Sequence, residues 1–340
     1  MSDPLNVAVV GATGAVGEVM LQILAERKFA VDKIYALASE RSVGKDVNFG
    51  NRQLPVDDLA KFDFSKVQIA LFSAGGSVSG EYAPIATAAG CVVIDNTSRF
   101  RYEDDIPLVV PEVNPERIAD YKKTGIIANP NCSTIQMVVA LKPIYDAVGI
   151  KRVNVATYQA VSGAGKSAIE EMVRQLTMLL NGRPLDLDGD AKQIAFNVVP
   201  QIDVFEDNGY TREEMKMVWE TQKILGDTDI AINATAVRVP VFYGHSEAIH
   251  IETAKKITAA EACDLLQESP GVTLVNGDDS SRFPTAATDA SGTDPVYVGR
   301  VREDVSHPRG IDLWVVADNI RKGAALNSVQ IAEILAKNYL

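Results

Sequence analysis

The sequence predicts an α/β protein in which a doubly wound, parallel-sheet domain is followed by a second, α+β domain. Buried-strand and helix patterns alternate from the N-terminus to about Ala128, as they do in doubly wound folds. The first strand runs directly into a glycine-rich loop and a helix. Past Cys132 the pattern changes, and 340 residues are too many for one small core, so we expect two domains.

The composition is that of a globular protein without a nucleic-acid partner. Hydrophobic residues make up 46% and charged residues 23% of the chain, which is typical of globular domains. The 33 basic and 45 acidic residues give a net charge of −12, so there is no basic surplus to neutralise phosphates. Three cysteines, Cys91, Cys132 and Cys263, make no disulfide framework and suit a reducing compartment. No signal pattern or membrane-length apolar run is present, so we expect a cytoplasmic protein without a membrane partner.

The first predicted strand, Leu5–Val10, leads into the loop Gly11-Ala12-Thr13-Gly14-Ala15-Val16-Gly17. The first glycine permits the tight turn, the second lets a pyrophosphate approach the backbone, and the third allows close packing of helix on strand. Strand, loop and helix all fall where a dinucleotide fingerprint requires them. The sequence therefore predicts a Rossmann-type dinucleotide-binding domain, with cofactor contacts at Gly11, Thr13, Gly14, Ala15 and Val16.

The second strand, Lys33–Ala38, ends in Ser39-Glu40-Arg41-Ser42. A carboxylate here would bind the ribose of NAD, and a cation would bind the 2′-phosphate of NADP. The segment offers both, but two hydroxyls beside a guanidinium form a good phosphate cradle. This favours NADP, bound by Ser39, Arg41 and Ser42, with Glu40 turned to solvent.

Two further strands supply candidate ligand contacts at their carboxyl ends. Val67–Ser73 is followed by Ala74-Gly75-Gly76, and a cofactor can lie against Ser73, Gly75 and Gly76 unless this is a plain strand-to-helix turn. Cys91–Asp95, whose cysteine we interpret as a core thiol, precedes Arg99. Arg99 is a candidate anion anchor, although surface charge is the usual explanation for a single arginine.

The centre of the predicted chemistry is Asn129-Pro130-Asn131-Cys132-Ser133-Thr134. It lies between the strand Gly125–Ala128 and the helix Ile135–Val148. Cys132 is thereby placed at or just before a helix N-terminus, where unpaired N–H groups and the helix dipole favour a thiolate. The same N–H groups could hold the oxygen of an attacked carbonyl. The alternative is that the cysteine packs as a small hydrophobe.

The second domain begins with the strand Arg152–Ala160, on which alternate residues, Val153, Val155, Thr157 and Gln159, share one face. Gln159 faces the loop Ser162-Gly163-Ala164-Gly165, which opens the helix Lys166–Leu180. The Gln159 amide could orient a carbonyl or a thioester, or it could be an ordinary polar residue at a strand edge.

Charged side chains follow on the next elements. Thr211 starts a capping box for a helix that runs to about Leu225, and Glu213 and Lys216 share one of its faces, where a solvated salt bridge is the common outcome. A strand, Thr235–Val241, carries Arg238, and a glycine turn then leads to His245. A histidine there can serve in acid–base catalysis, because its ordinary pKa lies near neutrality.

The chain closes with two strands, Val296–Val301 and Gly310–Val316, and a last helix, Leu326–Leu340. Between them lies Asp318-Asn319, followed by Gly323 and small residues that could let the last helix start near a nicotinamide. Simple packing is the alternative.

Taken together and in order, these motifs resemble the aspartate-semialdehyde dehydrogenase family over nearly the whole chain. The residues that carry the resemblance are Gly11 to Gly17, Asn131-Cys132-Ser133, Gln159, Ser162 to Gly165, Glu213, Lys216, Arg238, Gly244-His245-Ser246 and Asp318 to Ala325. One position departs from the family, since many relatives carry cysteine at Ala236; that side chain has no catalytic role in the family.

The resemblance implies an NADP-binding domain, 1–130 with 321–340, and a catalytic and dimerisation domain, 131–320, in a homodimer. It implies the reduction of L-aspartyl 4-phosphate to L-aspartate 4-semialdehyde through a cysteine thioester, and the reverse, in lysine, threonine, methionine and diaminopimelate biosynthesis. No metal is expected. The implied catalytic residues are Cys132 as nucleophile, His245 as acid–base and Gln159 to orient the acyl group. The implied substrate contacts are Arg238 for the α-carboxylate, Glu213 for the α-ammonium, Arg99 and Lys216 for the phosphate, and Asn131. Ser162, Gly163, Gly165 and Asn319 are expected to contact the cofactor.

Three other activities share parts of this pattern. N-acetyl-γ-glutamyl-phosphate reductase has the same thioester chemistry, but its substrate nitrogen carries no charge that would require Glu213, and its family usually has Asn-Pro-Gly-Cys. A glyceraldehyde-3-phosphate dehydrogenase has a different nucleophile motif. A non-catalytic NADP-binding sensor would not need Cys132, Gln159, Arg238 and His245 together.

Overall fold

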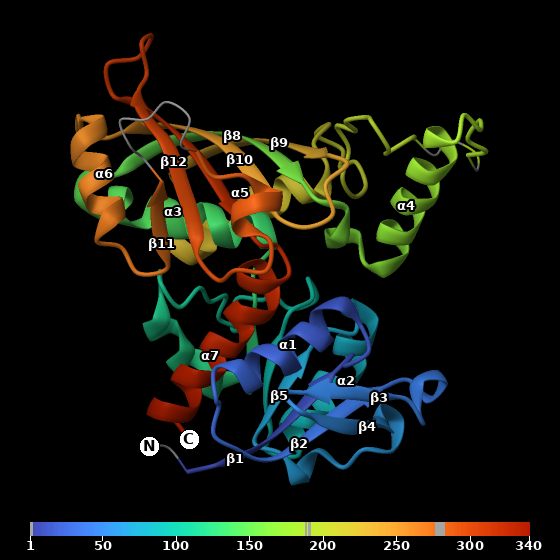
Figure 1. The fold of residues 1–340 in the computed structure, drawn as a ribbon. Helices are drawn as coiled ribbons and strands as arrows, with labels where there is room; N and C mark the ends of the chain where they lie inside the picture. The colour runs from blue at the N-terminus through green and yellow to red at the C-terminus, as the bar shows by residue number, and fades with distance from the viewer. Residues whose placement is uncertain (1–2, 188, 190–191, 276–282) are drawn as a thin grey trace. The chain divides into compact units, whose positions relative to one another are not determined.

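The computed structural model describes residues 3–187, 189, 192–275 and 283–340 (Figure 1). The chain divides into two compact units. Unit 1 comprises Met1–Asn131 with Gly323–Leu340, and unit 2 comprises Cys132–Lys322.

Unit 1 is built on a seven-stranded sheet in the order β3-β4-β2-β1-β5-β6-β7. All neighbouring strands are parallel except β3 and β4, which form an antiparallel hairpin at one edge. The strand order reverses on the two sides of β1, and ligands of doubly wound sheets bind beyond the carboxyl ends of the strands at such a reversal. The strands are β1 (Leu5–Val10), β2 (Val31–Ala38), β3 (Asp46–Phe49), β4 (Arg52–Asp58), β5 (Ile69–Phe72), β6 (Val92–Asp95) and β7 (Ile126–Ala128).

The α-helices in the described part of unit 1 are α1 (Ala15–Glu26), α2 (Gly76–Ala88) and α7 (Leu326–Asn338). α7 lies beside α1 although the two helices come from opposite ends of the chain (Figure 1). Met20 and Leu24 of α1 share one buried apolar cluster with Val329 of α7. An ion pair of 2.7 Å between Arg27 Nε and Glu333 Oε1 lies at the edge of this contact.

Unit 2 contains a six-stranded mixed sheet in the order β11-β12-β13-β10-β8-β9. Its central strands are antiparallel, and each edge strand runs parallel to its neighbour. The strands are β8 (Ile150–Gln159), β9 (Ala231–Arg238), β10 (His245–Thr253), β11 (Val272–Val275), β12 (Val296–Glu303) and β13 (Gly310–Ala317).

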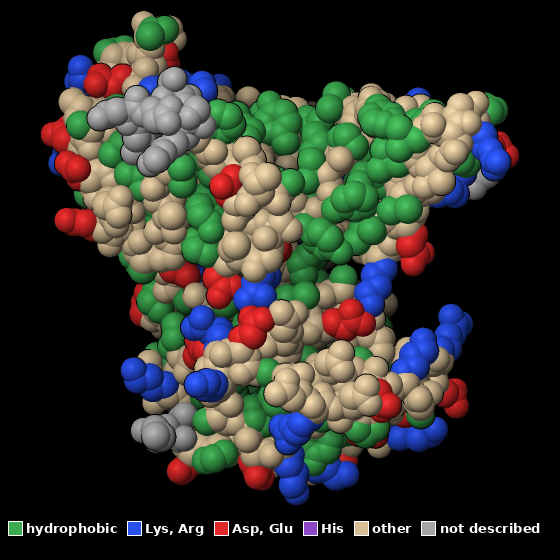
Figure 2. Space-filling model, viewed as in Figure 1, with side chains coloured by type: hydrophobic (Ala, Val, Ile, Leu, Met, Phe, Trp, Pro, Cys, Tyr) green, Lys and Arg blue, Asp and Glu red, His purple; other side chains and the backbone are tan. Residues whose placement is uncertain are grey.

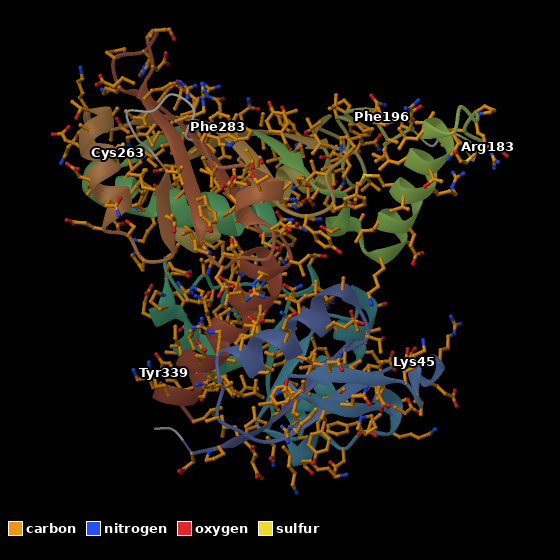
Figure 3. All side chains as sticks on the ribbon, viewed as in Figure 1. Lys45, Arg183, Phe196, Cys263, Phe283 and Tyr339 are labelled. Carbon is orange, nitrogen blue, oxygen red and sulfur yellow. The ribbon has the colours of Figure 1, made fainter. Side chains whose placement is uncertain are left out.

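The helices of unit 2 are α3 (Cys132–Val148), α4 (Lys166–Leu180), α5 (Arg212–Leu225) and α6 (Ala259–Gln267). α3 packs on the sheet and contacts both α5 and α6. It is the most buried of these helices, since its residues from Ser133 to Leu141 are all buried. Unit 2 also presents hydrophobic side chains to its outside (Figure 2). Phe196 and Phe283, which Figure 3 labels on its outer edge, are 65% and 46% exposed.

The structure confirms the predicted elements and corrects several of their ends. β1, α4 and the capping box of α5 lie where the sequence places them. α3 begins at Cys132, three residues before the predicted start, because the polar first turn carries no apolar period that could reveal it. β9 ends at Arg238, not Val241, because Pro240 has no N–H to donate to the ladder. The hairpin of β3 and β4, together with β11 and α6, was not predicted. Within the described part of the chain, no helix is both long and apolar enough to cross a membrane.

Candidate active site

Cys132 is the first residue of α3 in unit 2 and is only partly buried. The next two residues, Ser133 and Thr134, are fully buried, whereas the thiol stays within reach of a small molecule. The N–H groups of a first helical turn have no partner within the helix, so they and the helix dipole favour negative charge at this position. The predicted placement of a reactive cysteine at a helix N-terminus therefore fits the structure. Asn131, the last residue of the N-terminal part of unit 1, is 6% exposed.

His245 is the first residue of β10 and is completely buried, so it lies on a strand and not on the glycine turn that the sequence predicts. The backbone N–H of Ala160 donates a hydrogen bond of 3.0 Å to His245 Nδ1. Nδ1 must therefore be an acceptor, and the neutral ring carries its proton on Nε2. Burial, together with the positive charge of Arg238, lowers the pKa of His245 to about 3. Nε2 is buried and has no hydrogen-bond partner among the described residues.

Gly163 provides the opening above this imidazole. A Cβ at position 163 would lie 3.5 Å from His245 Nε2 and 3.3 Å from an Arg238 nitrogen. A larger side chain would thus fill the space that a substrate needs to reach both groups. Gly163 belongs to the short 3₁₀ turn Val161–Ala164 that follows β8.

Arg238 ends β9, and its Nη1 donates a hydrogen bond of 2.6 Å to the carbonyl oxygen of Ala160. Burial lowers the pKa of Arg238, while the negative charges of Glu213 and Cys132 act in the opposite direction. The guanidinium therefore lies within electrostatic reach of both groups. A partly buried cation beside the cysteine is suited to holding a substrate carboxylate.

Gln159 is the last residue of β8 and pairs with Arg238 across the parallel β8–β9 ladder. Its buried amide nitrogen donates to Ser133 Oγ and, at 3.1 Å, to Glu213 Oε1. The register of two strands thus places Gln159 and Arg238 side by side. The Gln159 amide links the first turn of α3 to α5.

Glu213 and Lys216 form an ion pair of 3.0 Å on α5. The sequence suggests a solvated pair, but the two side chains are only 8% and 13% exposed. Lys216 makes a second ion pair of 2.8 Å with Asp203, a residue that was not predicted to belong to the site. Asp203 comes from an irregular segment 13 residues before Lys216, so no local periodicity relates the two positions.

Asn319 connects the turn before His245 to the loop after β8. Its amide oxygen accepts hydrogen bonds from Gly244 N–H at 2.9 Å and from Ser162 Oγ at 3.2 Å. Both side chains are buried. Ser162 and Asn319, which are both expected to contact the cofactor, therefore also position one another. Of the other two cofactor contacts expected in unit 2, Gly163 is exposed and Gly165 is partly exposed.

In unit 1 the glycine loop has the geometry that its sequence predicts. Gly11 has φ = +85°, and a Cβ there would meet the backbone of Ser73 and Ala74 at about 3 Å. At Gly17 a Cβ would lie 2.2 Å from the carbonyl oxygen of Gly11. Only glycine permits both close approaches. Gly14 caps α1 without a side-chain hydrogen bond, and Ala15 and Val16 open the helix, whose N-terminus favours a bound anion.

A cleft of about 770 Å³ lies beside this loop. Its lining includes Glu40 and five of the predicted cofactor contacts, which are Gly11, Thr13, Gly14, Ser39 and Ser73. Further lining residues were not predicted: Asp58 ends β4, Lys61 follows it and Tyr82 belongs to α2. The cleft adjoins the glycine loop and the N-terminus of α1, which is a site suited to the phosphates of a dinucleotide.

The other predicted contacts in unit 1 lie around this cleft or beyond it. Arg41 is exposed and does not line the cleft, whereas Ser42 Oγ lies 3.5 Å from Thr13 Oγ1. Gly75 and Gly76 begin α2, and Gly75 has φ = +93° with open space around it. Arg99 is exposed and pairs with Glu103 at 2.9 Å. The structure therefore leaves the anion-binding roles of Arg41 and Arg99 as predictions.

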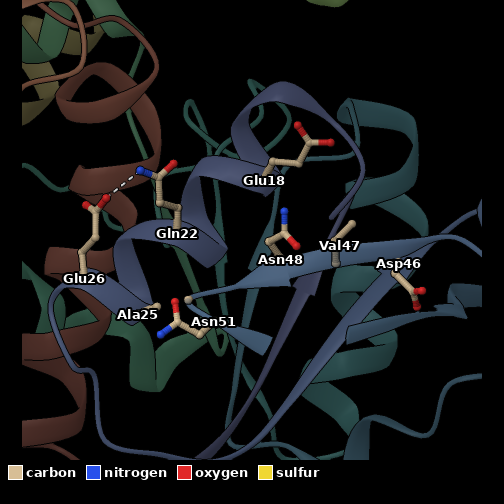
Figure 4. A pocket seen from close by; sticks show the side chains of 9 residues that line it. Glu18, Gln22, Ala25, Glu26, Asp46, Val47, Asn48 and Asn51 are labelled. Atoms are coloured by element: carbon tan, nitrogen blue, oxygen red, sulfur yellow. Dashed lines mark hydrogen bonds between the residues drawn. The ribbon is translucent and has the colours of Figure 1, made fainter. Parts of the chain in front are cut away.

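A second cavity in unit 1, of about 720 Å³, lies between α1 and the β3–β4 hairpin (Figure 4). Glu18, Glu26 and Asp46 are among the residues that line it, and Gln22 bonds Glu26 at 2.6 Å. An acidic lining of this kind does not suit a phosphate-bearing cofactor. Among the described residues there is also no group of histidine, cysteine and acidic side chains that could hold a metal ion.

Comparisons with known proteins agree with this organisation. Residues 6–121 match the family described as "Semialdehyde dehydrogenase, NAD binding domain", and residues 141–322 match "Semialdehyde dehydrogenase, dimerisation domain". The chain is 66% identical to an aspartate-semialdehyde dehydrogenase of Legionella pneumophila, with 100% of this chain and 98% of that protein covered. It is 62% identical to aspartate-semialdehyde dehydrogenase 2 of Vibrio cholerae, with full coverage of both.

Solved structures give the same result. A Vibrio cholerae aspartate semialdehyde dehydrogenase II complexed with ASA superposes with a TM-score of 0.97 at 61% identity, and 100% of each chain is covered. A Candida albicans aspartate semialdehyde dehydrogenase with NADP superposes with a TM-score of 0.78 at 27% identity, covering 99% of this chain and 100% of the other. The fold class and the enzyme class predicted from the sequence are confirmed. The chain belongs to the aspartate-semialdehyde dehydrogenase family of oxidoreductases.

Proposed function

We propose that the protein reduces L-aspartyl 4-phosphate to L-aspartate 4-semialdehyde with NADPH, and catalyses the reverse reaction, through a thioester on Cys132. The observation that carries the proposal is the grouping of three side chains around the first turn of α3. Arg238 lies within electrostatic reach of Cys132, Gln159 bonds Ser133, and His245 Nε2 lies near Arg238, since a Cβ at Gly163 would contact both. This set matches the needs of acyl transfer followed by reduction.

The first step is the attack of the Cys132 thiolate on the β-acyl phosphate. The carbonyl oxygen becomes negatively charged, and N–H groups at the start of α3 stabilise it. The C–O bond to the phosphate then breaks with its electron pair, and the phosphate leaves towards Lys216 and Arg99. Gln159 holds the acyl group, because its amide is fixed by Ser133 and Glu213.

NADPH supplies the hydride that reduces the thioester when it is bound. We propose that Gly11, Thr13, Gly14, Ala15 and Val16 hold its pyrophosphate, that Ser39, Arg41 and Ser42 bind its 2′-phosphate, and that Ser73, Gly75, Gly76, Ser162, Gly163, Gly165 and Asn319 complete its site. The cleft beside Gly11 and the glycine-capped start of α1 support this assignment in unit 1. The Candida albicans relative solved with NADP supports the choice of cofactor.

His245 acts at the oxygen of the reduced thioester. Its neutral ring carries the proton on Nε2, so it enters the reaction as a hydrogen-bond donor to the developing alkoxide. When the alkoxide collapses to the aldehyde, the C–S bond breaks and its electrons return to Cys132 as a thiolate. The hydrogen bond from Nε2 therefore stabilises the charge without a change in the protonation state of the ring.

The substrate's own charges explain the remaining polar groups. Arg238 would hold the α-carboxylate and Glu213 the α-ammonium, while Asn131 would contact the acyl group. Glu213 is buried, which supports this role, because a ligand that brings a positive charge stabilises a buried carboxylate. An N-acylated substrate would bring none, which favours aspartyl phosphate over N-acetyl-γ-glutamyl phosphate.

We further propose that residues 1–130 with 321–340 serve as the cofactor domain and 131–320 as the catalytic domain of a cytoplasmic homodimer. The exposed hydrophobic residues of unit 2, among them Phe196, Val198, Val204 and Phe205, support association through this unit. Its match to a domain described as a dimerisation domain supports the same conclusion.

The test is a spectrophotometric assay of NADPH formation from aspartate semialdehyde, phosphate and NADP. We expect turnover that requires phosphate and that is faster with NADP than with NAD. N-acetylglutamate semialdehyde serves as the alternative substrate. Faster turnover of that compound, or the absence of any phosphate-dependent turnover with aspartate semialdehyde, would contradict the proposal.

A further inference from the structure

Lys216 is held between two carboxylates. Its ammonium nitrogen lies 2.8 Å from Asp203 Oδ2 and 3.0 Å from Glu213 Oε2. The lysine is 13% exposed and Glu213 8%, whereas the Asp203 side chain is 33% exposed. One positive charge is therefore shared by two negative ones, of which Asp203 is the more accessible to water and to ligands.

The two carboxylates are held in different ways. Glu213 lies on α5, three residues before Lys216, and its other oxygen accepts a hydrogen bond from Gln159. Asp203 lies on the segment 199–206, which pairs with Arg238 at Val199 and with Thr211 at Phe205. This segment, fixed at both ends, carries its aspartate to Lys216.

Asp203 adopts an uncommon backbone conformation at this point, with φ = +70°. Its Oδ1 accepts a hydrogen bond of 2.9 Å from the N–H of Val204, while Oδ2 is directed to Lys216. Asp and Asn tolerate such a conformation better than most other residues do. The side chain is thus positioned by its own backbone as well as by the lysine.

Both groups remain charged at neutral pH. Burial acts to raise the pKa of Asp203, but hydrogen bonds from Lys216 and Val204 outweigh it and leave the pKa below its usual value. Burial likewise acts to lower the pKa of Lys216, and the charges of Glu213 and Asp203 outweigh it. An incoming phosphate therefore meets a lysine whose charge is already neutralised.

We propose that Asp203 is an exchangeable counter-ion that competes with phosphate for Lys216. The inference rests on the proposed role of Lys216 as a phosphate-binding residue. A phosphate dianion brought beside the ammonium is repelled by the Asp203 carboxylate, so phosphate must replace that carboxylate in order to bind. Glu213 stays in place through Gln159 and remains available to the substrate.

This exchange has two consequences for the reaction. Phosphate is held less tightly than a free buried lysine would hold it, which speeds its release after the acyl group has moved to Cys132. A singly charged anion that replaces the Asp203 carboxylate only exchanges one negative charge for another, so it gains little binding free energy. The site therefore prefers the doubly charged phosphoryl group. Asp203 would thus set the affinity and the selectivity of the phosphate site without contacting the reacting carbon.

The test compares Asp203→Asn with the unaltered protein in the direction that consumes phosphate. Asparagine keeps the shape, tolerates the positive φ and retains an oxygen for the Val204 N–H, so only the charge is lost. We expect the KM for phosphate to fall about threefold or more, while the KM for aspartate semialdehyde changes less. An unchanged or increased KM for phosphate would overturn the proposal, and an increase would show that Asp203 only orients the lysine.

Glu206→Gln is the matched control. It removes one negative charge from the same segment, but Glu206 pairs with Arg212 at 2.6 Å and not with Lys216. Its KM for phosphate should stay within about twofold of the starting value. An equal fall in both variants would show that the effect is one of general charge and would also overturn the proposal.

Lys216→Met and the double variant with Asp203→Asn separate this inference from the proposed function. If Lys216→Met raises the KM for phosphate and Asp203→Asn has no further effect in that background, the two residues act on one site as proposed. If Lys216→Met leaves the KM for phosphate unchanged, the phosphate-binding role of Lys216 is wrong and the inference falls with it. If Lys216→Met raises that KM and Asp203→Asn alone does not lower it, the inference alone is wrong.

Discussion

The N–H of Ala160 donates a hydrogen bond to Nδ1 of His245 over 3.0 Å. This single contact determines where the neutral imidazole carries its proton, because a nitrogen that accepts a hydrogen bond from the backbone cannot itself be protonated. The carbonyl oxygen of the same Ala160 accepts from Arg238. The backbone of one residue just beyond β8 therefore orients two of the side chains that we assign to the reaction.

Replacing Cys132 with alanine should abolish phosphate-dependent NADPH formation, with a loss of at least about 1000-fold in kcat, because the thioester cannot form. Cofactor binding, measured by NADPH fluorescence, should be unchanged. Cys263→Ala is the control, since Cys263 lies on α6 and should not affect turnover. Activity that persists in Cys132→Ala would show that Cys132 is not the nucleophile.

Replacing Glu213 with glutamine should raise the KM for aspartate semialdehyde about tenfold or more, because the charged hydrogen bond to the substrate ammonium is lost. Glutamine keeps an oxygen for the Gln159 amide, so the fold should be retained. The KM for NADP, measured on the same variant, provides the internal control. Equal KM values for the semialdehyde in the two proteins would argue against the ammonium-binding role.

Replacing Arg41 with alanine should lower kcat/KM for NADP about tenfold while that for NAD changes little, because only NADP carries a 2′-phosphate. Glu40→Ala, at the neighbouring position on the same short 3₁₀ turn, is the matched control and should not lower kcat/KM for NADP. Equal losses of kcat/KM with both cofactors in Arg41→Ala would show that this exposed arginine does not bind the 2′-phosphate.

The stability of the protein should fall below neutral pH because of His245. The folded-state pKa of about 3 lies below the ordinary value of 6.5, so between these values the unfolded chain binds a proton that the folded chain does not. The contribution of His245 is fully present above pH 6.5 and is lost by about 1.4 kcal/mol per pH unit as the pH falls towards 3.

The measurement for His245 is urea unfolding of the unaltered protein and of His245→Gln at several values between pH 4.5 and 7.5. The difference in the free energy of unfolding between the two proteins should shift in favour of the glutamine variant as the pH is lowered. His250→Gln serves as the control, because His250 is only partly buried and lies on the same strand. A difference that does not vary with pH would contradict the buried, neutral state of His245.

Glu247 should have the opposite pH dependence. It is fully buried on β10, opposite Thr157 of β8, and burial raises its pKa well above the usual value. The contribution of Glu247 to stability is then fully present below pH 4.5 and is lost as the pH rises, because the unfolded chain releases a proton that the folded chain retains. Glu247→Gln should therefore stabilise the protein at pH 8 and have little effect at pH 4.

Differential scanning fluorimetry at the two pH values measures the effect of Glu247→Gln. Glu252→Gln, on the same strand but partly exposed, is the matched control and should shift the melting temperature little at either pH. A melting temperature that falls at pH 8 on replacement of Glu247 would show that the carboxylate is ionised and paired in the folded protein.

The sequence by itself determined most of the elements and the residue types proposed for the site. The alternating face of β8 up to Gln159, the capping box of α5 and the glycine loop after β1 are local signals, and each depends on residues that are neighbours in the chain. The position of Cys132 at the start of a helix was also readable, because it depends only on the strand and the helix on either side of it.

Only the tertiary structure decided which distant residues meet. The register of β8 and β9 places Gln159 beside Arg238, and the segment 199–206 brings Asp203 to Lys216. The proton position on His245 depends on a backbone N–H that lies 85 residues away in the chain. Such contacts arise when strands pair and segments cross, and no periodicity in the sequence records them. Hydrogen bonds and ion pairs act over a few ångströms in space, whereas sequence patterns report order along the chain.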